Sequence, residues 1–465
     1  MEYLAHILVI VSLYAILAAS FNLLIGWAGL FALSQAAFFG VGAYAVALLT
    51  TKLGLGFPLP LFAGVIVAAL VGMLVALPAL RIGGDHLVIV TLALQIIVIA
   101  IMVNWRSLTG GTDGIPHIPK IVILGAALDT AGKFLPLAAS VAALALGAAW
   151  ILVRSPFARA VRAMRENEAA TLAIGKNVVA LKLTVFAFSA GLAAVAGGLY
   201  AQYLSYVSSD AFTLDVTINV LAMVILGGTG NLWGSVLGAA LLTMLPEALN
   251  FITLPPDIAD KSREILYGAA LIAILAWRPQ GLIPEPAGRH RARGRIATRS
   301  FLEEIGPADG MVWVKASGLM RRFGGIIAVD GLDLELRRGR ITGLIGPNGA
   351  GKTTSFNLLT GFLRSDGGVI EVGGTVLGPA APHRIVRAGL ARSFQDLRLF
   401  TRMSVLDNVR VALPGQRGDH LRYVFFAPFR VAREEAENAA RAMDILDFVG
   451  LSHRALDRAE DLSYA

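Results

Sequence analysis

The sequence contains no cysteine and little charge. Among its 465 residues only 15% are Asp, Glu, Lys or Arg, whereas 56% are hydrophobic. The absence of cysteine excludes disulfides, thiol nucleophiles and Cys-based zinc sites. The scarcity of charge excludes an ordinary soluble globular chain, in which about a quarter of the residues are charged. Many of the apolar residues therefore need a solvent other than water.

Charge also divides the chain into two parts. Residues 1–277 hold 13 Lys/Arg and 12 Asp/Glu, whereas residues 278–465 hold 27 and 20. The first part is nearly neutral, as a membrane domain is, and the second has the charge of a water-soluble domain. We expect a transmembrane domain over 1–284, a basic linker over 285–310 and a soluble domain over 311–465.

The first part contains about nine apolar runs that cross or nearly cross a bilayer, which takes about 20 residues of helix. The runs are Leu4–Ile25, Leu30–Leu49, Leu59–Leu80, Leu87–Val103, Phe134–Val153, Leu183–Leu204, Val216–Leu226, Leu232–Leu249 and Ile265–Trp277. The first run has no basic residue ahead of it and no small-residue cleavage site, which predicts a retained span rather than a signal peptide.

Basic residues in the short loops predict the orientation. The loop Arg154–Lys182 carries six Lys/Arg against Glu166 and Glu168, so we expect it to face the cytoplasm. The loop Ser205–Asp215 carries two aspartates and no basic residue, so we expect it to face outward. Threading the chain from there places the soluble domain in the cytoplasm.

The linker is rich in arginine, with Arg289, Arg291, Arg293, Arg295 and Arg299. No basic helix interleaved with aromatic residues accompanies them, so we expect membrane lipid rather than nucleic acid as the partner of these charges.

The soluble part alternates short strands with helical stretches, which is typical of an α/β fold. We expect strands at Val312–Val314, Leu332–Leu336 and Ile341–Ile345. Directly after the third strand, residues 346–353 match the phosphate-loop pattern G-x-x-x-x-G-K-[ST], and a helix is expected near Lys352. The backbone N–H groups of such a loop cradle phosphates, the lysine neutralises them, and the hydroxyl of Thr353 is the expected ligand for Mg²⁺.

Leu319–Gly325, Ala328–Asp330 and the phosphate loop together resemble the opening of an ABC-type ATP-binding domain. The resemblance implies that Phe323 stacks on adenine, with core packing as the alternative, and that Gln395 senses Mg²⁺ and the γ-phosphate, with a surface glutamine as the alternative. The expected cofactors are ATP and Mg²⁺, the latter bound by Thr353 and Gln395. The expected ATP-binding residues are Phe323, Gly346, Pro347, Asn348, Gly349, Ala350, Gly351, Lys352, Thr353, Thr354 and Gln395.

The membrane part is similar to the branched-chain amino acid permease family. The blocks that carry this similarity are Asn22–Gly29, Phe38–Tyr44, Leu80–Asp85 with Val90–Leu92, Leu226–Gly234 and Arg278–Leu282. Polar residues within the spans line a solute path or form interhelical hydrogen bonds, and we favour the second reading. These residues are Asn22, Ser34, Gln35, Gln95 and Asn219.

The basic loop resembles the short cytoplasmic helix with which importer permeases dock on their ATPase. The resemblance implies docking through Arg165, Glu166, Glu168, Ala169, Ala170 and Gly175. Four residues separate Ala170 from Gly175, where the wider pattern has three. A plain positive-inside loop is the alternative.

The resemblance stops at the signature of ABC domains, because the sequence ends Leu462, Ser463, Tyr464, Ala465. We expect a domain over 311–465 that stops before the signature and the Walker B strand, so that no catalytic residue is present. Such a chain is expected to bind ATP weakly without turning it over alone, and to expose apolar surface at Ile341–Ile345.

The expected fold is an α-helical polytopic membrane domain followed by an incomplete P-loop α/β ABC-type ATP-binding domain. The resemblance implies a fused subunit for ATP-driven import of branched-chain or related amino acids across the inner, cytoplasmic membrane. Its implied partners are a second permease subunit, a second ABC ATP-binding subunit and an extracytoplasmic solute-binding protein. The alternatives are an importer of urea or short amides, and a truncated membrane protein that does not couple.

Overall fold

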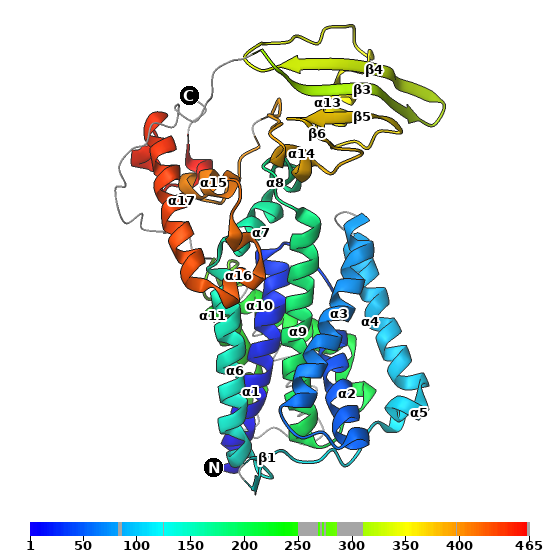
Figure 1. Cartoon of the computed structure of the whole chain (residues 1–465). Helices are drawn as coiled ribbons and strands as arrows, with labels where there is room; N and C mark the ends of the chain where they lie inside the picture. Colours follow the sequence, from blue (N-terminus) through cyan, green and yellow to red (C-terminus); the bar gives the residue numbers. More distant parts are fainter. Residues whose placement is uncertain are drawn as a thin grey trace. The chain divides into compact units, whose positions relative to one another are not determined.

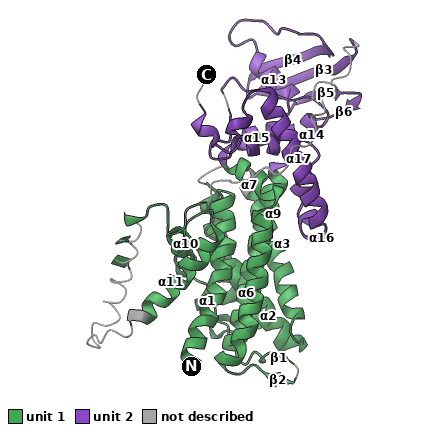
Figure 2. Ribbon diagram, turned by 90° about the vertical axis from the view of Figure 1, so that its left-hand side faces the viewer, with its two compact units in different colours: residues 1–165, 179–286 green, residues 166–178, 287–465 purple. Residues whose placement is uncertain are grey.

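The computed structural model describes residues 1–81, 86–123, 125–249, 268–269, 272–273, 276–285, 310–396 and 398–462. The chain forms two compact units, shown in Figure 2. Unit 1 comprises residues 1–165 and 179–286, and unit 2 comprises residues 166–178 and 287–465. Most of the expected span Ile265–Trp277 and of the expected linker lies outside the residues that the structure describes.

Unit 1 is a helical membrane domain (Figure 1). Among the residues that the structure describes, seven helices are long and apolar enough to cross a membrane, and an eighth, Leu232–Glu247, is apolar but shorter; all eight correspond to expected spans. The α-helices of these eight segments are α1 (Glu2–Asn22), α2 (Gln35–Leu53), α3 (Leu59–Arg81), α4 (His86–Asn104), α6 (Ala131–Val153), α9 (Val178–Leu204), α10 (Leu214–Gly227) and α11 (Leu232–Leu249). The short elements are η1 (Leu23–Trp27), α5 (Arg106–Thr109), η2 (Gly111–Asp113), β1 (Val122–Ile123), β2 (Ala126–Ala127) and η3 (Ser209–Phe212).

Glycines let the helices of unit 1 approach closely. A Cβ added to Gly42 would lie 2.3 Å from Cα of Ala194, and one added to Gly238 would lie 2.0 Å from the carbonyl oxygen of Met223. Close backbone approach of this kind is what small residues provide between membrane helices, where apolar lipid supplies no hydrophobic driving force. These two glycines therefore serve close helix packing.

Helix α2 begins at Gln35, five residues later than its expected start at Leu30. The amide of Ala36 donates to Oγ1 of Thr217 at 3.0 Å, and that of Ala37 to Oε1 of Gln95 at 2.7 Å. Both acceptors come from other helices, α10 and α4, so the first turn of α2 is capped by tertiary contacts. A sequence pattern does not contain that information.

The basic loop forms two helices rather than the one expected. Helix α7 spans Pro156–Glu166 and α8 spans Glu168–Ala173. The break lies at Asn167, whose backbone is extended and whose Oδ1 accepts a hydrogen bond from the amide of Ala170 at 2.9 Å. Asparagine is a favoured N-cap because it satisfies an amide at the start of a helix, so Asn167 starts α8 and breaks the run.

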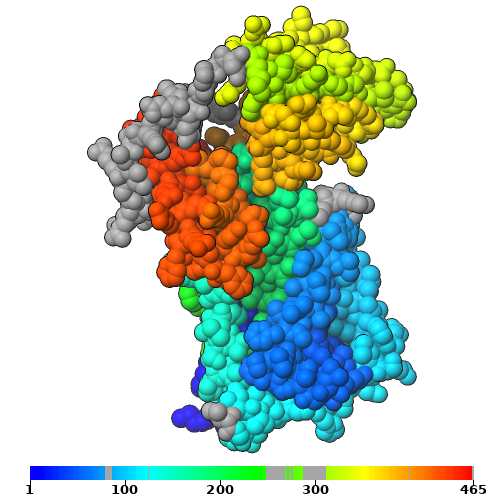
Figure 3. All heavy atoms as spheres, viewed as in Figure 1, coloured from blue at the N-terminus to red at the C-terminus, as the bar shows by residue number. Residues whose placement is uncertain are grey.

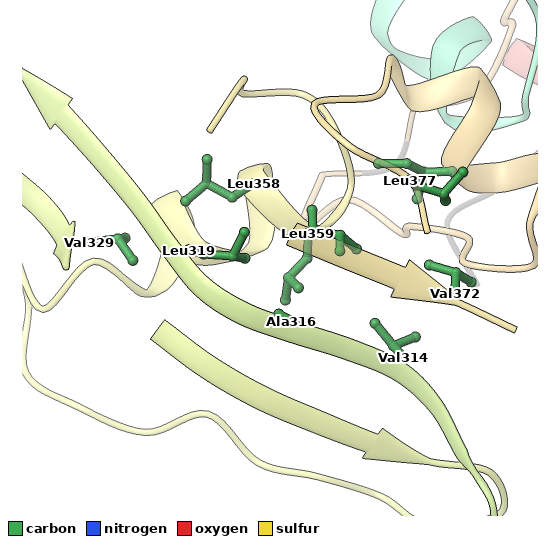
Figure 4. Packing of buried hydrophobic residues seen from close by; sticks show 10 residues of the cluster. Val314, Ala316, Leu319, Val329, Leu358, Leu359, Val372 and Leu377 are labelled. Atoms are coloured by element: carbon green, nitrogen blue, oxygen red, sulfur yellow. The ribbon is translucent and has the colours of Figure 1, made fainter. Parts of the chain in front are cut away.

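Unit 2 is built on a four-stranded antiparallel sheet of order β4-β3-β5-β6. The strands are β3 (Val312–Phe323), β4 (Ile326–Arg337), β5 (Gly367–Val372) and β6 (Thr375–Val376). The first two contain the expected strands Val312–Val314 and Leu332–Leu336. Helix α13 (Lys352–Leu359) begins where the sequence predicts and packs on the sheet through Leu358 and Leu359, as Figure 4 shows.

The expected strand Ile341–Ile345 is not a strand in the structure. A strand is defined by backbone pairing with a neighbour, and among the described residues no strand pairs with this segment. Its side chains are exposed, with relative exposures of 104% for Ile341 and 93% for Ile345. The prediction of a strand was therefore wrong, whereas the expected apolar exposure at these residues is present.

The remainder of unit 2 is helical and has a second core. Its elements are α14 (Pro382–Arg387), α15 (Val405–Ala412), η5 (Arg417–Asp419), α16 (Leu421–Phe426), α17 (Pro428–Phe448), η6 (Ser452–Arg454) and η7 (Ala459–Asp461). The core forms where Leu406 of α15 meets Ala442 and Leu446 of α17. Within unit 2, α16 lies at the end opposite to the β3–β4 hairpin in both Figure 1 and Figure 2.

Candidate functional site

The phosphate loop is an exposed turn that leads into α13. Residues 346–350 are exposed, and Gly349 and Gly351 have φ angles of 87° and 79°. Glycine adopts this left-handed region without steric cost, and the conformation turns backbone N–H groups toward one side of the loop. The local geometry suits an anion.

Gly351 is held against the sheet. A Cβ at this position would lie 2.4 Å from the carbonyl oxygen of Ala328 in β4. Gly351 is also the N-cap of α13. The absence of a side chain therefore sets both the start of the helix and its distance from the β3–β4 hairpin.

The start of α13 presents several donors. The first intrahelical bond runs from the amide of Ser355 to the carbonyl of Gly351 at 2.8 Å, which leaves the amides of Lys352, Thr353 and Thr354 without an intrahelical acceptor. Nζ of Lys352 folds back over the loop and donates to the carbonyls of Gly346 and Pro347, both at 2.7 Å. Free amides, the helix dipole and an ammonium group together form an anion site.

The segment that carries Gln395 is fastened to α13 by an arginine that the sequence reading left without a role. Nη1 of Arg392 donates to Oδ1 of Asn357 at 2.6 Å and to Oγ1 of Thr360 at 3.2 Å. The guanidinium also lies 5.0 Å from the ring centres of both Phe362 and Phe394. Burial and the nearby charge of Arg398 lower the pKa of Arg392 from its ordinary value.

Gln395 itself is exposed, three residues beyond Arg392, and its segment is not a strand. The structure records no hydrogen bond between Gln395 and the phosphate loop in the part of the chain that it describes. The two sites are connected through α13, to which Arg392 binds. The sensing role of Gln395 stays a prediction.

Phe323 ends β3 and pairs with Ile326 across the hairpin. Its side chain is 47% exposed, and the guanidinium of Arg321 lies 4.9 Å from its ring centre. Core packing was the alternative role for Phe323, and it does not fit a side chain with this exposure. The ring is accessible to a planar base, and it lies in the same hairpin as Ala328, which approaches Gly351.

Oxygen donors for Mg²⁺ are sparse in the described residues. No group of three or more His, Asp or Glu is placed to hold a metal among them. Thr353 and Gln395 offer a hydroxyl and an amide oxygen, which are suitable for Mg²⁺ only beside phosphate oxygens and water. These two residues fit a nucleotide-bound Mg²⁺, not a free metal site.

The segment 166–178, which includes α8, packs within unit 2 on α14. Gly175 has a φ of 83°, and a Cβ there would lie 3.1 Å from Cγ1 of Val386 in α14. Oε2 of Glu166 accepts a hydrogen bond from the amide of Arg402 at 3.0 Å. Of the other predicted docking residues in this segment, Ala170 is buried, Ala169 is half-buried and Glu168 is exposed.

A buried ion pair adds to this contact and was not predicted. Nζ of Lys176 lies 2.7 Å from Oδ2 of Asp419 in η5, and the two side chains are only 6% and 16% exposed. The two residues are far apart in sequence, so no local sequence pattern predicts the pair. An ion pair of this burial is sensitive to the loss of either partner.

Arg165 is separate from the other predicted docking residues. Its guanidinium contacts the carbonyl of Gly26 and lies 3.0 Å from Oε1 of Glu285, both in unit 1. Arg162 lies 3.8 Å from the same carboxylate oxygen. Arg165 thus binds residues of the membrane unit.

Two of the sequence blocks that resemble permeases, Asn22–Gly29 and Leu226–Gly234, meet at Asn22. Its Nδ2 donates to the carbonyl of Asn231 at 2.9 Å and to Oγ of Ser235 at 2.6 Å, and its Oδ1 accepts from the amide of Gly230 at 2.9 Å. The amide of Leu282 in turn donates to the carbonyl of Leu226 at 2.9 Å. Three separate blocks are therefore joined by hydrogen bonds in unit 1.

Most of the polar residues named in the spans form hydrogen bonds between helices, which is the interpretation that we favoured from the sequence. Gln95 donates to the carbonyl of Phe212 at 2.7 Å besides accepting from Ala37. Gln35 donates to Ser20. Asn219 differs because it is exposed. Thr91 and Thr217, which accept from the amides of Leu33 and Ala36, were missed, since threonine in a span gives no signal of its own.

Two family models match the chain. The model described as branched-chain amino acid transport system / permease component matches residues 3–275, more than half of the chain. The ABC transporter model matches residues 329–465.

Relatives match each part separately. The high-affinity branched-chain amino acid transport system permease protein LivM of Escherichia coli (strain K12) is 35% identical, with 58% of this chain and 68% of that protein covered. The high-affinity branched-chain amino acid transport ATP-binding protein LivG of Salmonella typhimurium is 42% identical, with 32% of this chain covered. The chain spans 58% of the length of this second relative.

A crystal structure of a nucleotide-free ATP-binding cassette from an ABC transporter is 31% identical, covering 33% of this chain and 60% of that chain with a TM-score of 0.27. The membrane helices of unit 1 agree with the match to the permease model, and the phosphate loop of unit 2 agrees with the match to the ABC transporter model. The chain is a multi-pass membrane protein that belongs to the permease component family of branched-chain amino acid transport systems, joined to an ATP-binding part of the ABC transporter family.

Proposed function

We propose that the chain is a fused subunit of an ABC importer that takes up branched-chain or related amino acids with energy from ATP. One observation carries the proposal: a permease part and an ATP-binding part lie in one chain, and the relatives of both bear the names of branched-chain amino acid transport proteins. Two unrelated halves would not be expected to point to the same solute.

The phosphate loop supports the role of ATP. The amides at the start of α13, Lys352 and the exposed ring of Phe323 supply a phosphate cradle, a counter-charge and a platform for adenine. Mg²⁺ held by Thr353 and Gln395 beside the phosphates would neutralise further charge. These contacts provide nucleotide affinity.

The packing of segment 166–178 supports coupling. This segment continues directly into α9, a membrane helix, while it contacts α14 and η5. A displacement of α14 would therefore be passed to α9 through the packed helix α8, and a displacement of η5 through the buried ion pair. We infer that α8 carries movement between nucleotide and solute path.

The further components follow from the same proposal. The transporter is expected to contain a second permease subunit, a second ATP-binding subunit and an extracytoplasmic solute-binding protein, in the inner, cytoplasmic membrane. The proposal is supported by the names of the relatives, which are a permease protein and an ATP-binding protein of branched-chain amino acid transport.

Uptake by the full chain tests the proposal. Proteoliposomes that contain the chain with its three partners should accumulate leucine when ATP and Mg²⁺ are added, and Lys352→Ala should abolish accumulation. Lys315→Ala serves as a matched control, because this lysine is 52% exposed on β3 and its ion pair is with the surface carboxylate of Glu335.

Competition identifies the solute. Excess isoleucine or valine should reduce leucine uptake, and excess urea should not. Accumulation of urea in place of leucine would favour the amide importer. ATP binding without accumulation of either solute would favour the non-coupling alternative.

A further inference from the structure

The C-terminal end of α1 departs from an α-helix and is buried in unit 1. The helix starts at the surface, where Figure 3 shows its first residues in dark blue, and continues into the π-helix η1, in which Gly26 is buried. In a continuing α-helix the amide of Leu30 would donate to the carbonyl of Gly26, but it donates instead to the carbonyl of Leu24, at 2.8 Å. The carbonyl of Gly26 is therefore left to another donor, in a type of turn that is frequent at functional sites.

That donor is Arg165, the last residue of unit 1 before the segment 166–178. Its Nη1 donates to the carbonyl of Gly26, and its Nη2 donates to both carboxylate oxygens of Glu285, at 3.0 and 3.1 Å. Nε of Arg162, one turn earlier in α7, lies 3.8 Å from the same carboxylate. The guanidinium of Arg165 is thus bound between the negative end of a helix and a carboxylate, and charge-assisted bonds of this kind are the strong ones.

Two glycines make room for this ion pair. A Cβ on Gly29 would lie 2.5 Å from Cγ of Arg165, and one on Gly230 would lie 2.9 Å from Cδ of Glu285. A side chain at either position would therefore displace a member of the pair. The backbone is shaped around the two side chains, which distinguishes this pair from a surface ion pair between flexible side chains.

Apolar packing between η1 and α7 is incomplete. A small apolar pocket lies where the two elements meet, lined among others by Leu23 and Trp27 of η1 and by Phe157 and Val161 of α7. Atoms that line such a space lack contact partners on that side. The polar bonds of Arg165 therefore carry a large share of the attachment of η1 to α7.

We propose that Arg165 and Glu285 form a latch, which holds the end of α1 to α7 and opens when the segment 166–178 is displaced. Glu166 follows Arg165 directly, and its Oε2 accepts a hydrogen bond from the amide of Arg402 within unit 2. A displacement of this segment therefore acts on Arg165 through the adjoining peptide bond. The latch rests on the proposed function, of which it is a regulatory step.

Opening of the latch changes the state of a membrane span. Once the guanidinium moves away, the carbonyl of Gly26 and the carboxylate of Glu285 lose a charged donor, and the π turn becomes free to rearrange. Helix α1 packs along α6 and α11 within unit 1, so a change at its end reaches both neighbouring spans. Arg165 is thus a positioning residue of the transport cycle.

Hydrogen exchange at the amides of Ala28 and Leu30 measures opening in the full chain with its partners, because these two amides close the π turn. A non-hydrolysable ATP analogue, at a concentration at which its binding is observed, should increase their exchange several-fold in the native chain. In Arg165→Gln the exchange should be equally fast without the analogue. Lys133→Gln is the matched control, because this lysine pairs with Asp129 at an exposed site of unit 1, and it should behave as the native chain does.

The coupling ratio distinguishes a latch from a bond that only stabilises the fold. In proteoliposomes with the three partners, Arg165→Gln and Glu285→Gln should each lower the ratio of leucine accumulated to ATP hydrolysed several-fold, because the span is released without a nucleotide-driven step. A variant that is merely less stable loses both rates in proportion, so its ratio stays unchanged. Asp129→Asn, the control for Glu285→Gln, should keep the native ratio.

A native coupling ratio in both latch variants would overturn the proposal. Exchange at Ala28 and Leu30 that does not respond to the bound analogue in the native chain would overturn it as well, and would leave Arg165 as a static brace. Failure of the proposed function is seen separately, since the native chain would then accumulate no leucine, whereas the exchange measurement needs no solute.

Discussion

At the residue scale, Gly351 is constrained both by its left-handed backbone and by its close contact with Ala328. Comparison with Gly374 separates these two constraints. Gly351 and Gly374 share a φ of 79°, but a Cβ on Gly351 would lie 2.4 Å from the carbonyl of Ala328, whereas one on Gly374 would meet nothing within 4 Å. Gly374→Ala should therefore cost roughly 1–2 kcal/mol from the left-handed backbone alone. Gly351→Ala should cost more, because α13 must also move away from β4.

Hydrogen exchange of the α13 amides and binding of a fluorescent ATP analogue would measure both effects in the full chain. Only Gly351→Ala is expected to weaken nucleotide binding, since it shifts the start of α13. Equal losses of protection and binding in the two variants would show that the contact with Ala328 is unimportant.

Two asparagines of the membrane unit allow a similar comparison. Asn22 is buried and joins the 22–29 block to Asn231, Ser235 and Gly230, whereas Asn219 is exposed. Asn22→Ala leaves buried polar groups without partners and should lower the free energy of unfolding by about 1–3 kcal/mol. Asn219→Ala should change it by at most about 0.5 kcal/mol.

Thermal unfolding of both variants in detergent would provide the measurement. A variant at Asn22 as stable as the one at Asn219 would contradict the role of Asn22 in joining the sequence blocks. It would leave van der Waals contact between glycines as the main source of packing there.

At the scale of elements, the contact between α8 and α14 should respond to pH. Burial, together with Arg387 and Arg384, lowers the pKa of His383 in α14 from its ordinary value of 6.5. The unfolded state binds a proton more readily than the folded state, so stability is fully present above about pH 6.5 and falls as the pH decreases below that value. Protection of α14 and α8 against hydrogen exchange should therefore decrease between about pH 7.5 and about pH 5.5.

The variant His383→Asn is the control for this dependence, because it cannot titrate. Its protection factors, corrected for the intrinsic exchange rate, should be nearly independent of pH over the same interval. A decrease of equal size in the variant would assign the effect to another group.

Elements that depend on local pattern were predictable, and those that depend on tertiary contacts were not. Long apolar runs identified the spans because the bilayer sets their length. Helix α13 followed from its phosphate loop. The segment Ile341–Ile345 has the apolar composition of a strand but pairs with no strand among the described residues, and the start of α2 depends on Thr217 and Gln95, which lie far away in sequence.

At the scale of the whole molecule, the parts of the candidate site that depend on tertiary contacts could not be predicted from the sequence either. The glycines and lysine of the phosphate loop are contiguous, so sequence was sufficient to locate them. Arg392 and the pair of Lys176 with Asp419 join segments that the sequence separates, and only the fold brings them together. The resemblance indicated that α8 would dock, but not which charges would hold it.

The orientation of the membrane unit is the last prediction. Six basic residues in the loop Arg154–Lys182 and none in the loop Ser205–Asp215 predict that the two ends of α9 lie on opposite sides of the membrane, with α8 inside. Glu168 and Asp210 are both exposed acidic residues, one in each loop, and the chain has no native cysteine. In intact cells, Asp210→Cys should react with a membrane-impermeant thiol reagent and Glu168→Cys should be protected. Permeabilised cells provide the control, because both cysteines should react there. Labelling at 168 but not at 210 in intact cells would invert the topology, and would place α8 and the rest of unit 2 on the side of the membrane where ATP is absent.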